Sequence, residues 1–218
     1  MTAPTVLWNG TRGPDRPALV LAHGAGAPMD SAFLEFFAER LSQAGIAVGR
    51  FEFPYMAARR QGERRGPDRA PVLLESWREV IAAADAEGGS RRALFIGGKS
   101  MGGRIASMVA DDEGVLGVVC LGYPFHPAGK AAQTRVAHLE SLQTPTLIVQ
   151  GERDTLGSRD DVAGYRLSRT IAVHWLADGD HSFKPRKSSG RTERQNWDEA
   201  VDAIAAFIRR VTDEVRAL

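Results

Sequence analysis

Cysteine, net charge and long apolar runs are all scarce in this sequence. Its single cysteine, Cys120, cannot form an intrachain disulfide, which predicts the reducing environment of the cytoplasm. Residues 1–5 lack the basic and apolar regions of a signal peptide, and no apolar run approaches the length that spans a membrane. A formal net charge of +1 gives no signal for nucleic acid. We therefore expect a cytoplasmic protein with a small-molecule substrate and no nucleic-acid or membrane partner; the oligomeric state is left unspecified.

Metal-ligand spacing is missing as well. Five histidines and one cysteine are scattered along the chain without the intervals that metal sites use, so we expect no metal and no other cofactor. With 218 residues, of which 43% are hydrophobic and 25% charged, the chain is long enough for one sizeable core and short for two. Residues 1–218 are therefore expected to form one domain.

Short apolar runs alternate with helical patterns along the chain. The runs are typical of strands buried on both faces of a parallel sheet, and they cover residues 6–8, 18–22, 46–53, 93–96, 115–121, 146–149 and 171–176. Helical patterns occupy residues 32–44, 72–87, 104–110, 158–167 and 192–215, whereas the arginine-rich segment 56–71 has no periodicity and is expected to be a surface loop. This alternation predicts an α/β fold with one doubly wound, mostly parallel sheet of about six to seven strands. Segment 128–142 is short for a connection that could hold a lid, so no large lid domain is expected.

One segment combines an apolar run, two pairs of glycines and a helical pattern. Residues 93–96 lead into Gly98-Lys-Ser-Met-Gly102, which fits G-x-S-x-G. Between a strand and a helix, this motif is typical of a nucleophile elbow, a tight turn that exposes a serine hydroxyl above the edge of a sheet. Ser100 is therefore the candidate nucleophile.

A phosphate-binding loop is a remote alternative for the same residues, with Ala93 in place of its first glycine and Lys99-Ser100 at its end. Such a loop must be flexible and glycine-rich before the lysine, whereas residues 94–97 resemble a buried strand. The next strand also ends at Gly122-Tyr-Pro124, without an aspartate for a magnesium ion. The elbow interpretation instead implies that Lys99 points away from the hydroxyl.

Two more reactive side chains follow later strands. Asp154 comes after the strand at 146–149, and His181 comes after the strand at 171–176. Because parallel strands end at one edge of a sheet, we expect both to meet Ser100 there, in the chain order of α/β-hydrolases. His181 would take the serine proton, and Asp154 would orient the imidazole. Asp178 and Asp180 are expected to form turns.

An oxyanion needs backbone N–H donors near the nucleophile. The N–H of Met101, directly after the serine, is one candidate. The loop after the strand at 18–22 supplies the second, with Ala25 as first choice and Gly26 as the next. His23 is expected to organise this loop.

Six segments also match a known family when they are taken together. They are His23–Asp30, Phe51–Met56, Gly97–Arg104, Leu121–His126, Gln150–Asp154 and Asp178–Lys184. With them the chain resembles small α/β-hydrolase-like proteins of the testis-expressed and NSL-complex-subunit type, related to dienelactone hydrolases. The resemblance implies an α/β-hydrolase fold with Ser100, Asp154 and His181 in the catalytic places. Dienelactone hydrolases have a cysteine nucleophile where this chain has Ser100, so their substrate does not carry over.

These observations predict a serine hydrolase of the carboxylesterase or thioesterase type that acts on small acyl substrates through an acyl-enzyme. The alternative is a catalytically weak protein-interaction module with the same fold, since some members of the resembling family are components of larger assemblies.

Basic residues gather in two segments. Five arginines face two acids between residues 59 and 69, and five basic residues face one acid between 184 and 194. Both segments follow strand ends at the expected site, and a cleft lined by one sign of charge concentrates ligands of the other sign. An anionic substrate is therefore expected, with a candidate rim of Arg59, Arg60, Lys184, Arg186 and Lys187.

Overall fold

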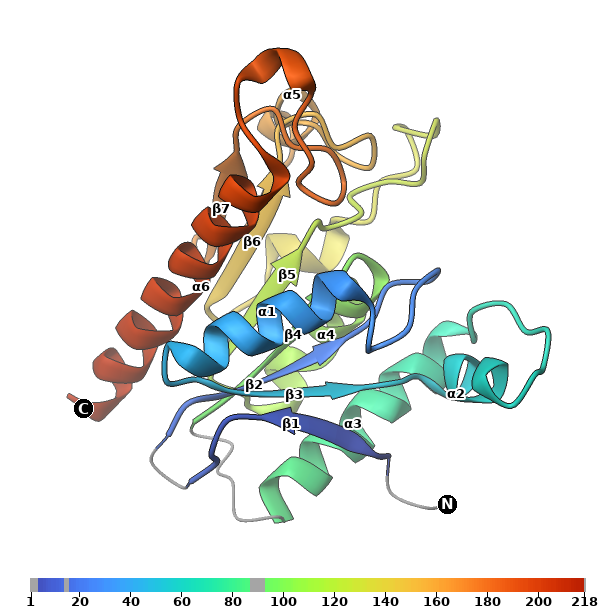
Figure 1. The fold of residues 1–218 in the computed structure, drawn as a ribbon, viewed down its shortest axis with the longest axis vertical. Helices are drawn as coiled ribbons and strands as arrows, with labels where there is room; N and C mark the ends of the chain where they lie inside the picture. The colour runs from blue at the N-terminus through green and yellow to red at the C-terminus, as the bar shows by residue number, and fades with distance from the viewer. Residues whose placement is uncertain (1–3, 14–15, 87–92, 218) are drawn as a thin grey trace.

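A seven-stranded sheet runs through the molecule (Figure 1). The computed structural model describes residues 4–13, 16–86 and 93–217. The strands are β1 (Val6–Asn9), β2 (Ala18–Ala22), β3 (Ala47–Phe51), β4 (Leu94–Lys99), β5 (Gly117–Leu121), β6 (Thr146–Gly151) and β7 (Ile171–Leu176), in the order β1-β3-β2-β4-β5-β6-β7. Only β1 is antiparallel to its neighbour; the other pairs are parallel. The sheet predicted from the sequence is confirmed.

Helices cover both faces of the sheet. In Figure 1, α1 (Ala32–Gln43) and α6 (Glu193–Arg216) lie in front of it, and α3 (Ala70–Ala86) and α4 (Met101–Glu113) lie behind. Alternate residues of the central strands enter the two cores: in β2, Leu19 and Leu21 pack with α1 and α6, whereas Val20 and Ala22 pack with α3 and α4. This alternation explains why β2 is apolar throughout, because a strand buried on both faces has no solvent side.

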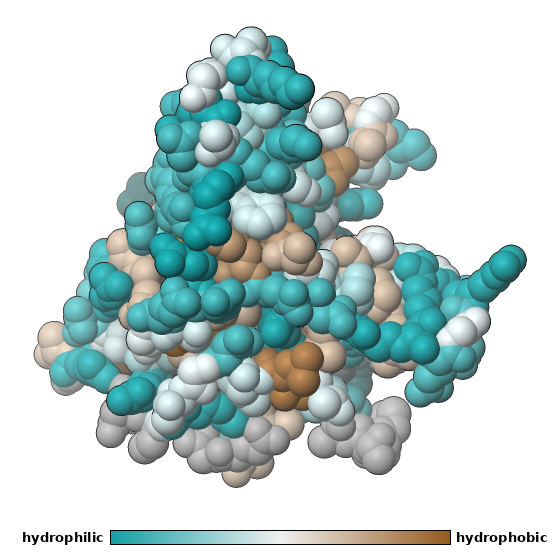
Figure 2. All heavy atoms as spheres, viewed as in Figure 1, coloured by the Kyte–Doolittle hydropathy of each residue, from teal (hydrophilic) through white to brown (hydrophobic). Residues whose placement is uncertain are grey.

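The surface on the viewed side is mostly hydrophilic, with apolar side chains in small patches (Figure 2). Among the described residues, the large hydrophobic side chains that are exposed are Leu7, Val72 and Val215. No helix in the described segments combines the length and the apolar character that a membrane crossing requires.

The segment after β3 is a helix, which corrects the prediction of a loop from residue 56. Pro54 is the first residue of helix α2 (Pro54–Arg60), and Phe53 before it has an extended backbone. Proline is favoured at the start of a helix because it has no N–H to leave unpaired and its φ is already helical. With only seven residues, α2 is too short to show a periodic pattern, and it is fixed by the buried Tyr55 and Met56.

The remaining helices agree with the sequence in type but not always in length. Helix α5 (Arg159–Ala163) stops at Gly164 rather than at residue 167, and its capping box at Ser158 and Asp161 is confirmed. The capping box that begins α6 at Thr192 is confirmed as well. The predicted end of α3 at Glu87 lies outside the described residues. Between β5 and β6 the chain forms turns and a 3-10 helix (Ala137–Glu140), with no lid domain; a second 3-10 helix spans Lys187–Ser189.

A substitution at Gly97, in the middle of β4, tests how tightly the sheet is packed. A Cβ atom at this position would lie 1.9 Å from the carbonyl oxygen of Val119 on β5. Backbone of a central sheet cannot move aside easily, so Gly97→Ala should lower the free energy of unfolding by about 3 kcal/mol, measured by chemical denaturation. Gly66→Ala is the control: nothing lies within 4 Å of its added Cβ, and the change should stay within about 0.5 kcal/mol. Equal stability of the two variants would contradict this account.

Candidate active site

The candidate nucleophile sits in a strained turn between β4 and α4. Ser100 has φ 52° and ψ −114°, a region that costs a residue other than glycine roughly 1–3 kcal/mol. The glycines on either side permit the turn. A Cβ at Gly98 would lie 2.1 Å from the carbonyl oxygen of Ala22, and one at Gly102 would lie 2.5 Å from the same atom. The motif therefore forms the elbow that the sequence predicted, with β2 directly against it.

The candidate base and acid are in contact. The Nδ1 atom of His181, in the loop after β7, lies 2.7 Å from Oδ2 of Asp154, in the loop after β6. Asp154 is fully buried, whereas the His181 side chain keeps 28% of its surface exposed. An acceptor at Nδ1 places the ring proton there and leaves Nε2 free to accept one.

Asp154 is itself held by two donors. Gln150, the residue before the end of β6, donates from Nε2 to Oδ2 of Asp154 at 2.9 Å. The backbone N–H of Leu156 donates to the other carboxylate oxygen at 2.8 Å. Sequence reasoning missed Gln150, although it is a polar residue at the end of an apolar strand and fully buried. These two hydrogen bonds hold the Asp154 carboxylate in the orientation in which it contacts His181.

A pocket of about 310 Å³ brings the serine and the histidine together. Ser100 and His181 both line it, with the loop of residues 24–27 and the start of α1 at Ser31, Phe33 and Leu34. Within the described residues the two reactive side chains make no hydrogen bond to each other. In ligand-free enzymes this contact is often long and shortens only in the complex with substrate. The arrangement places a hydroxyl, an imidazole and a buried carboxylate in series.

The loop after β2 lies beside the nucleophile. A Cβ at Gly24 would be 3.7 Å from the Cβ of Ser100. His23 organises this loop as predicted: its Nε2 accepts from the N–H of Phe53 at 3.1 Å, so its Nδ1 carries the proton and donates to the carbonyl of Gly24 at 2.7 Å. Burial lowers the pKa of His23, which keeps the ring in this neutral form.

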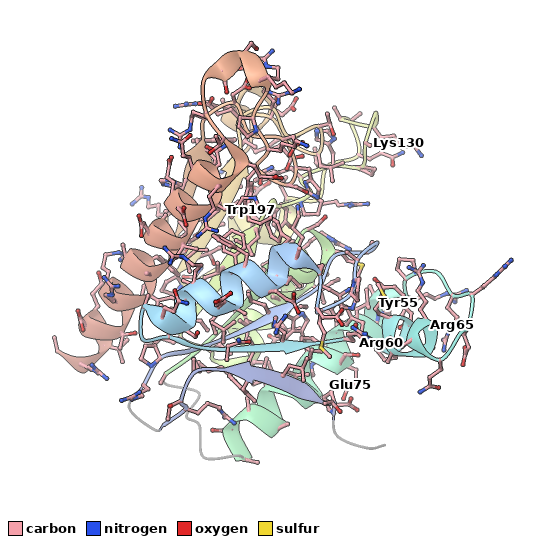
Figure 3. All side chains as sticks on the ribbon, in the orientation of Figure 1. Tyr55, Arg60, Arg65, Glu75, Lys130 and Trp197 are labelled. Atoms are coloured by element: carbon pink, nitrogen blue, oxygen red, sulfur yellow. The ribbon has the colours of Figure 1, made fainter. Side chains whose placement is uncertain are left out.

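Tyr55, on α2, also contacts the loop after β2 (labelled in Figure 3). Its hydroxyl lies 3.1 Å from the carbonyl oxygen of Ala25 and 3.3 Å from that of Gly24. Burial raises the pKa of Tyr55 to about 12, so the hydroxyl remains a donor at neutral pH. Sequence reasoning missed this residue because its partners lie about thirty residues earlier in the chain.

The direction of these carbonyls sets the direction of the neighbouring N–H groups. The described peptide bonds are all trans, and in a planar trans peptide the N–H points opposite to the C=O. The N–H groups of Ala25 and Gly26 therefore point away from Tyr55, on a loop that lines the pocket. Met101 is the first residue of α4, so its N–H has no partner within the helix. The two candidate oxyanion donors therefore come from the loop after β2 and from the first turn of α4.

A sequence family described as an alpha/beta hydrolase domain matches residues 15–209. The chain belongs to this alpha/beta hydrolase family. The seven-stranded sheet and the elbow after β4 are the features of its fold that carry the site.

Solved structures of other alpha/beta hydrolases share this fold. An alpha-beta serine hydrolase homologue from Coxiella burnetii superposes with a TM-score of 0.67 at 18% identity, over 94% of this chain and 90% of that one. A Xanthomonas campestris serine hydrolase described as lacking a lid gives 0.68 at 18% identity, over 94% and 88%. Est1E from Butyrivibrio proteoclasticus, with ferulic acid bound, gives 0.70 at 14% identity, over 94% and 96%. At such identities the likeness is one of fold.

The candidate rim residues are not among the described residues that line the Ser100 pocket. Arg186 lies against Asp178 in an ion pair, and Arg60 pairs with Glu52 and Asp30 at 2.7 and 2.6 Å. Arg60, labelled in Figure 3, also lines a different pocket of about 560 Å³.

The other rim candidates do not line the pocket either. Arg59 donates to the carbonyl of Arg65 at 2.5 Å, and neither it nor Lys184 or Lys187 is among the described residues that line the Ser100 pocket. Asp178 and Asp180 form turns as expected, Asp180 by accepting from the N–H groups of residues 182 and 184.

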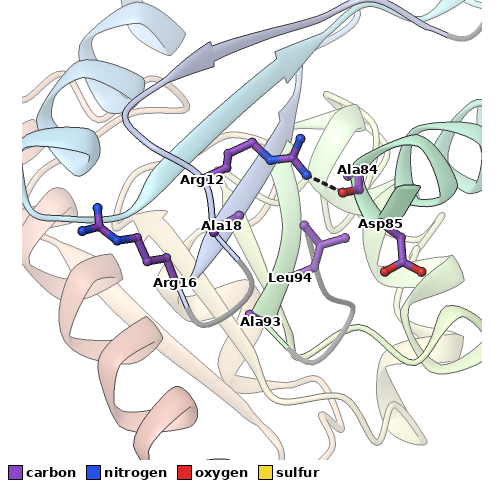
Figure 4. Close-up of a pocket in the computed structure, with 8 residues that line it drawn as sticks. Arg12, Arg16, Ala18, Ala84, Asp85, Ala93 and Leu94 are labelled. Carbon is purple, nitrogen blue, oxygen red and sulfur yellow. Dashed lines mark hydrogen bonds between the residues drawn. The ribbon is translucent and has the colours of Figure 1, made fainter. Parts of the chain in front are cut away.

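The segment before Lys99 does not form a phosphate-binding loop. The residues that a phosphate-binding loop would need between Ala93 and Lys99 form β4 instead, which contradicts that interpretation. Among the described residues, no group of three or more His, Cys, Asp or Glu side chains is placed to hold a metal ion. A cavity beside Arg12 and Leu94, at the opposite ends of the strands, has a volume of only about 10 Å³ (Figure 4). It is too small for a substrate.

Tyr55→Phe tests whether the carbonyl contacts position the loop. Removing one oxyanion donor outright lowers kcat by two to three orders of magnitude, so loosening its loop should lower kcat by about tenfold with KM unchanged. The measurement is steady-state hydrolysis of p-nitrophenyl acetate, with the melting temperature recorded alongside.

Tyr123→Phe is the matched control for this prediction. Its hydroxyl donates to the carbonyl of Arg135 at 2.9 Å, so the variant loses the same kind of bond outside the loop. A similar loss of stability in both variants, with kcat lowered only in Tyr55→Phe, supports the positioning role. Unchanged kcat in Tyr55→Phe would rule it out.

Proposed function

We propose that this alpha/beta hydrolase is a serine hydrolase of the carboxylesterase or thioesterase type. Ser100 is the nucleophile, His181 the base and Asp154 the residue that orients the base. One observation carries the proposal: a serine held in a strained elbow shares a pocket with an imidazole whose other nitrogen contacts a fully buried carboxylate. Strain of this kind persists where a functional geometry needs it.

The reaction follows from these positions. Nε2 of His181 takes the proton of the Ser100 hydroxyl as the oxygen attacks the scissile carbonyl, and Asp154 stabilises the imidazolium without taking up a proton. The N–H groups of Met101 and of Ala25 donate to the oxyanion. His181 then gives its proton to the leaving oxygen or sulfur, which leaves an acyl-enzyme. Water, deprotonated by the same histidine, releases the acid and restores Ser100.

The pocket favours a small acyl substrate. Its volume of about 310 Å³ and its wall of Phe33 and Leu34 suit a short or medium acyl chain. Without a lid domain between β5 and β6, the site is open to molecules of varied shape.

The finer relationship to testis-expressed and NSL-complex-subunit proteins, and through them to dienelactone hydrolases, is part of the same proposal. It rests on the six matching segments. The complete Ser100, His181 and Asp154 arrangement, with its supporting Gln150 and Tyr55, favours an active enzyme over an interaction module. A module would have no use for the strain at the elbow.

A cytoplasmic location is proposed from the single cysteine, which is buried in β5.

A fluorophosphonate probe tests the nucleophile without knowledge of the substrate. We expect the label on Ser100, and we expect Ser100→Ala to abolish both labelling and hydrolysis of p-nitrophenyl acetate. Ser107→Ala is the control, because its hydroxyl is buried in α4 and donates to the carbonyl of Arg104; it should keep both. Label mapped to Ser182 or Ser107, or activity that survives in Ser100→Ala, would refute the assignment.

Asp154→Asn tests the orienting acid. An amide in this place favours the wrong tautomer of His181, so kcat should fall by roughly 10³–10⁴ with little change in KM. Asp180→Asn is the matched control: its side-chain oxygen can still accept from the N–H groups of residues 182 and 184, and kcat should change little. A larger loss in Asp180→Asn would transfer the role to that residue.

A further inference from the structure

The last residue of β4 brings a cation to the pocket wall. Lys99 directly precedes Ser100, and both line the pocket of about 310 Å³. Its ammonium group donates a hydrogen bond to the main-chain carbonyl of His181. Sequence reasoning expected Lys99 to point away from the hydroxyl; in the structure its side chain reaches the main chain of His181, and the residue lines the same pocket as the nucleophile and the base.

The ammonium group is poorly compensated within the protein. It lies 5.3 Å from the ring centre of Phe33 and 5.8 Å from that of Phe183. Among the described residues, no carboxylate lies within 4.0 Å of Nζ. An ammonium has three donors, and the carbonyl of His181 accepts from one of them. Two aromatic faces and one carbonyl attract the cation but do not neutralise it.

Burial makes this charge sensitive to its surroundings. Desolvation lowers the pKa of Lys99 to about 8, against the opposing effect of the Asp154 and Asp180 carboxylates. At neutral pH the group is therefore mostly charged. A charge in such a place is stabilised by a partner of opposite sign, and the open side of the pocket is where a ligand could supply one.

We propose that the substrates carry a carboxylate on the acyl chain and that the ammonium group of Lys99 binds it. This inference rests on the proposed serine hydrolase function. The acyl side is favoured because the acyl group stays bonded to Ser100 in the acyl-enzyme, next to Lys99 in the chain. The inference replaces the surface rim as the source of anion preference, because Arg60 and Arg186 already have carboxylate partners.

Paired esters that differ only in charge test the proposal. The substrates are the mono-4-nitrophenyl esters of glutaric, adipic and pimelic acid, each beside its neutral carboxamide analogue, with spontaneous hydrolysis subtracted. Charge-assisted hydrogen bonds are the stronger kind, so kcat/KM should favour the carboxylate by at least about tenfold for the chain length that reaches Lys99. The measured quantity is the ratio of the two kcat/KM values.

Variants separate anion binding from the structural role of Lys99. A variant of Lys99 also loses the hydrogen bond to the carbonyl of His181. That loss changes kcat/KM for both esters of a pair by the same factor, so it cancels in their ratio. Lys99→Met should therefore bring the ratio to about one, and Lys99→Arg, which keeps the charge, should preserve a preference. Lys130→Met is the matched control, because Lys130 is an exposed lysine in a loop (labelled in Figure 3); its ratio should equal that of the unaltered protein.

The pH dependence of the ratio gives an independent measurement on the unaltered protein. The ammonium form exists below the pKa of about 8, so the ratio should be highest near pH 7 and fall toward one as pH rises past 8. Asp154 and Asp180 are the carboxylates whose charge acts on Lys99, and both esters of a pair meet the same His181, so its effect cancels in the ratio. An exposed lysine, with an ordinary pKa above 10, would hold the preference to higher pH.

The outcomes are distinct. Hydrolysis of both esters with a ratio of one in the unaltered protein overturns the carboxylate inference and leaves the hydrolase function standing. A ratio that persists in Lys99→Met but is lost in Arg186→Met or Lys187→Met returns the preference to the rim. No hydrolysis of any ester, together with no fluorophosphonate label on Ser100, rejects the proposed function itself. If Lys99→Met does not fold, Lys99→Arg and the pH profile still decide.

Discussion

The turn at Ser100 is the constraint on which the site depends. Ser100 is held there with φ 52° between β4 and α4. The backbone just before it, at Gly98, and just after it, at Gly102, packs against the end of β2. Side chains at Gly98 and Gly102 would collide with the carbonyl of Ala22, so the sequence must supply glycine at both positions. The cost of the turn, roughly 1–3 kcal/mol, is offset by the two cores that fix β4 in the centre of the sheet. Because β4 is central, the loops after β2 and β7 line one pocket with Ser100, and the loop after β6 contacts the loop after β7 through Asp154 and His181.

Each reactive group is positioned by a neighbour that acts from behind it. Gln150 and the N–H of Leu156 hold Asp154. Tyr55 and His23 hold the carbonyls of the loop at residues 24–25. Gln150 and His23 lie at strand ends, whereas Tyr55 comes from helix α2, which explains why this short helix matters for the site. Preorganised donors and acceptors of this kind lower the reorganisation that the reaction requires.

The sequence allowed the sheet to be predicted, and Ser100, Asp154 and His181 to be placed at one edge of it, because most strands are continuous apolar runs and parallel strands end at one edge. It did not allow α2 to be predicted, since seven residues show no period. The role of Tyr55 was hidden because it depends on contacts about thirty residues away. The ion pairs of the arginine-rich segments were hidden for a related reason. A count of charges gives their sum, but the pairing of Arg60 with Glu52, and of Arg186 with Asp178, is decided by tertiary structure.

This pairing bears on where a hydrolase of this shape can gain selectivity for charge. Exposed ion pairs contribute about 0–1 kcal/mol, and at physiological ionic strength salt largely screens an exposed charge from groups more than about 8 Å away. Surface arginines that already face carboxylates, such as Arg60 and Arg186, add little field at the nucleophile. A cation in the pocket wall acts through protein rather than water, where the same charge interacts more strongly. Lys99 has that location because it is fixed by the strand that also fixes Ser100. The elbow therefore determines both the nucleophile and the sign of charge beside it.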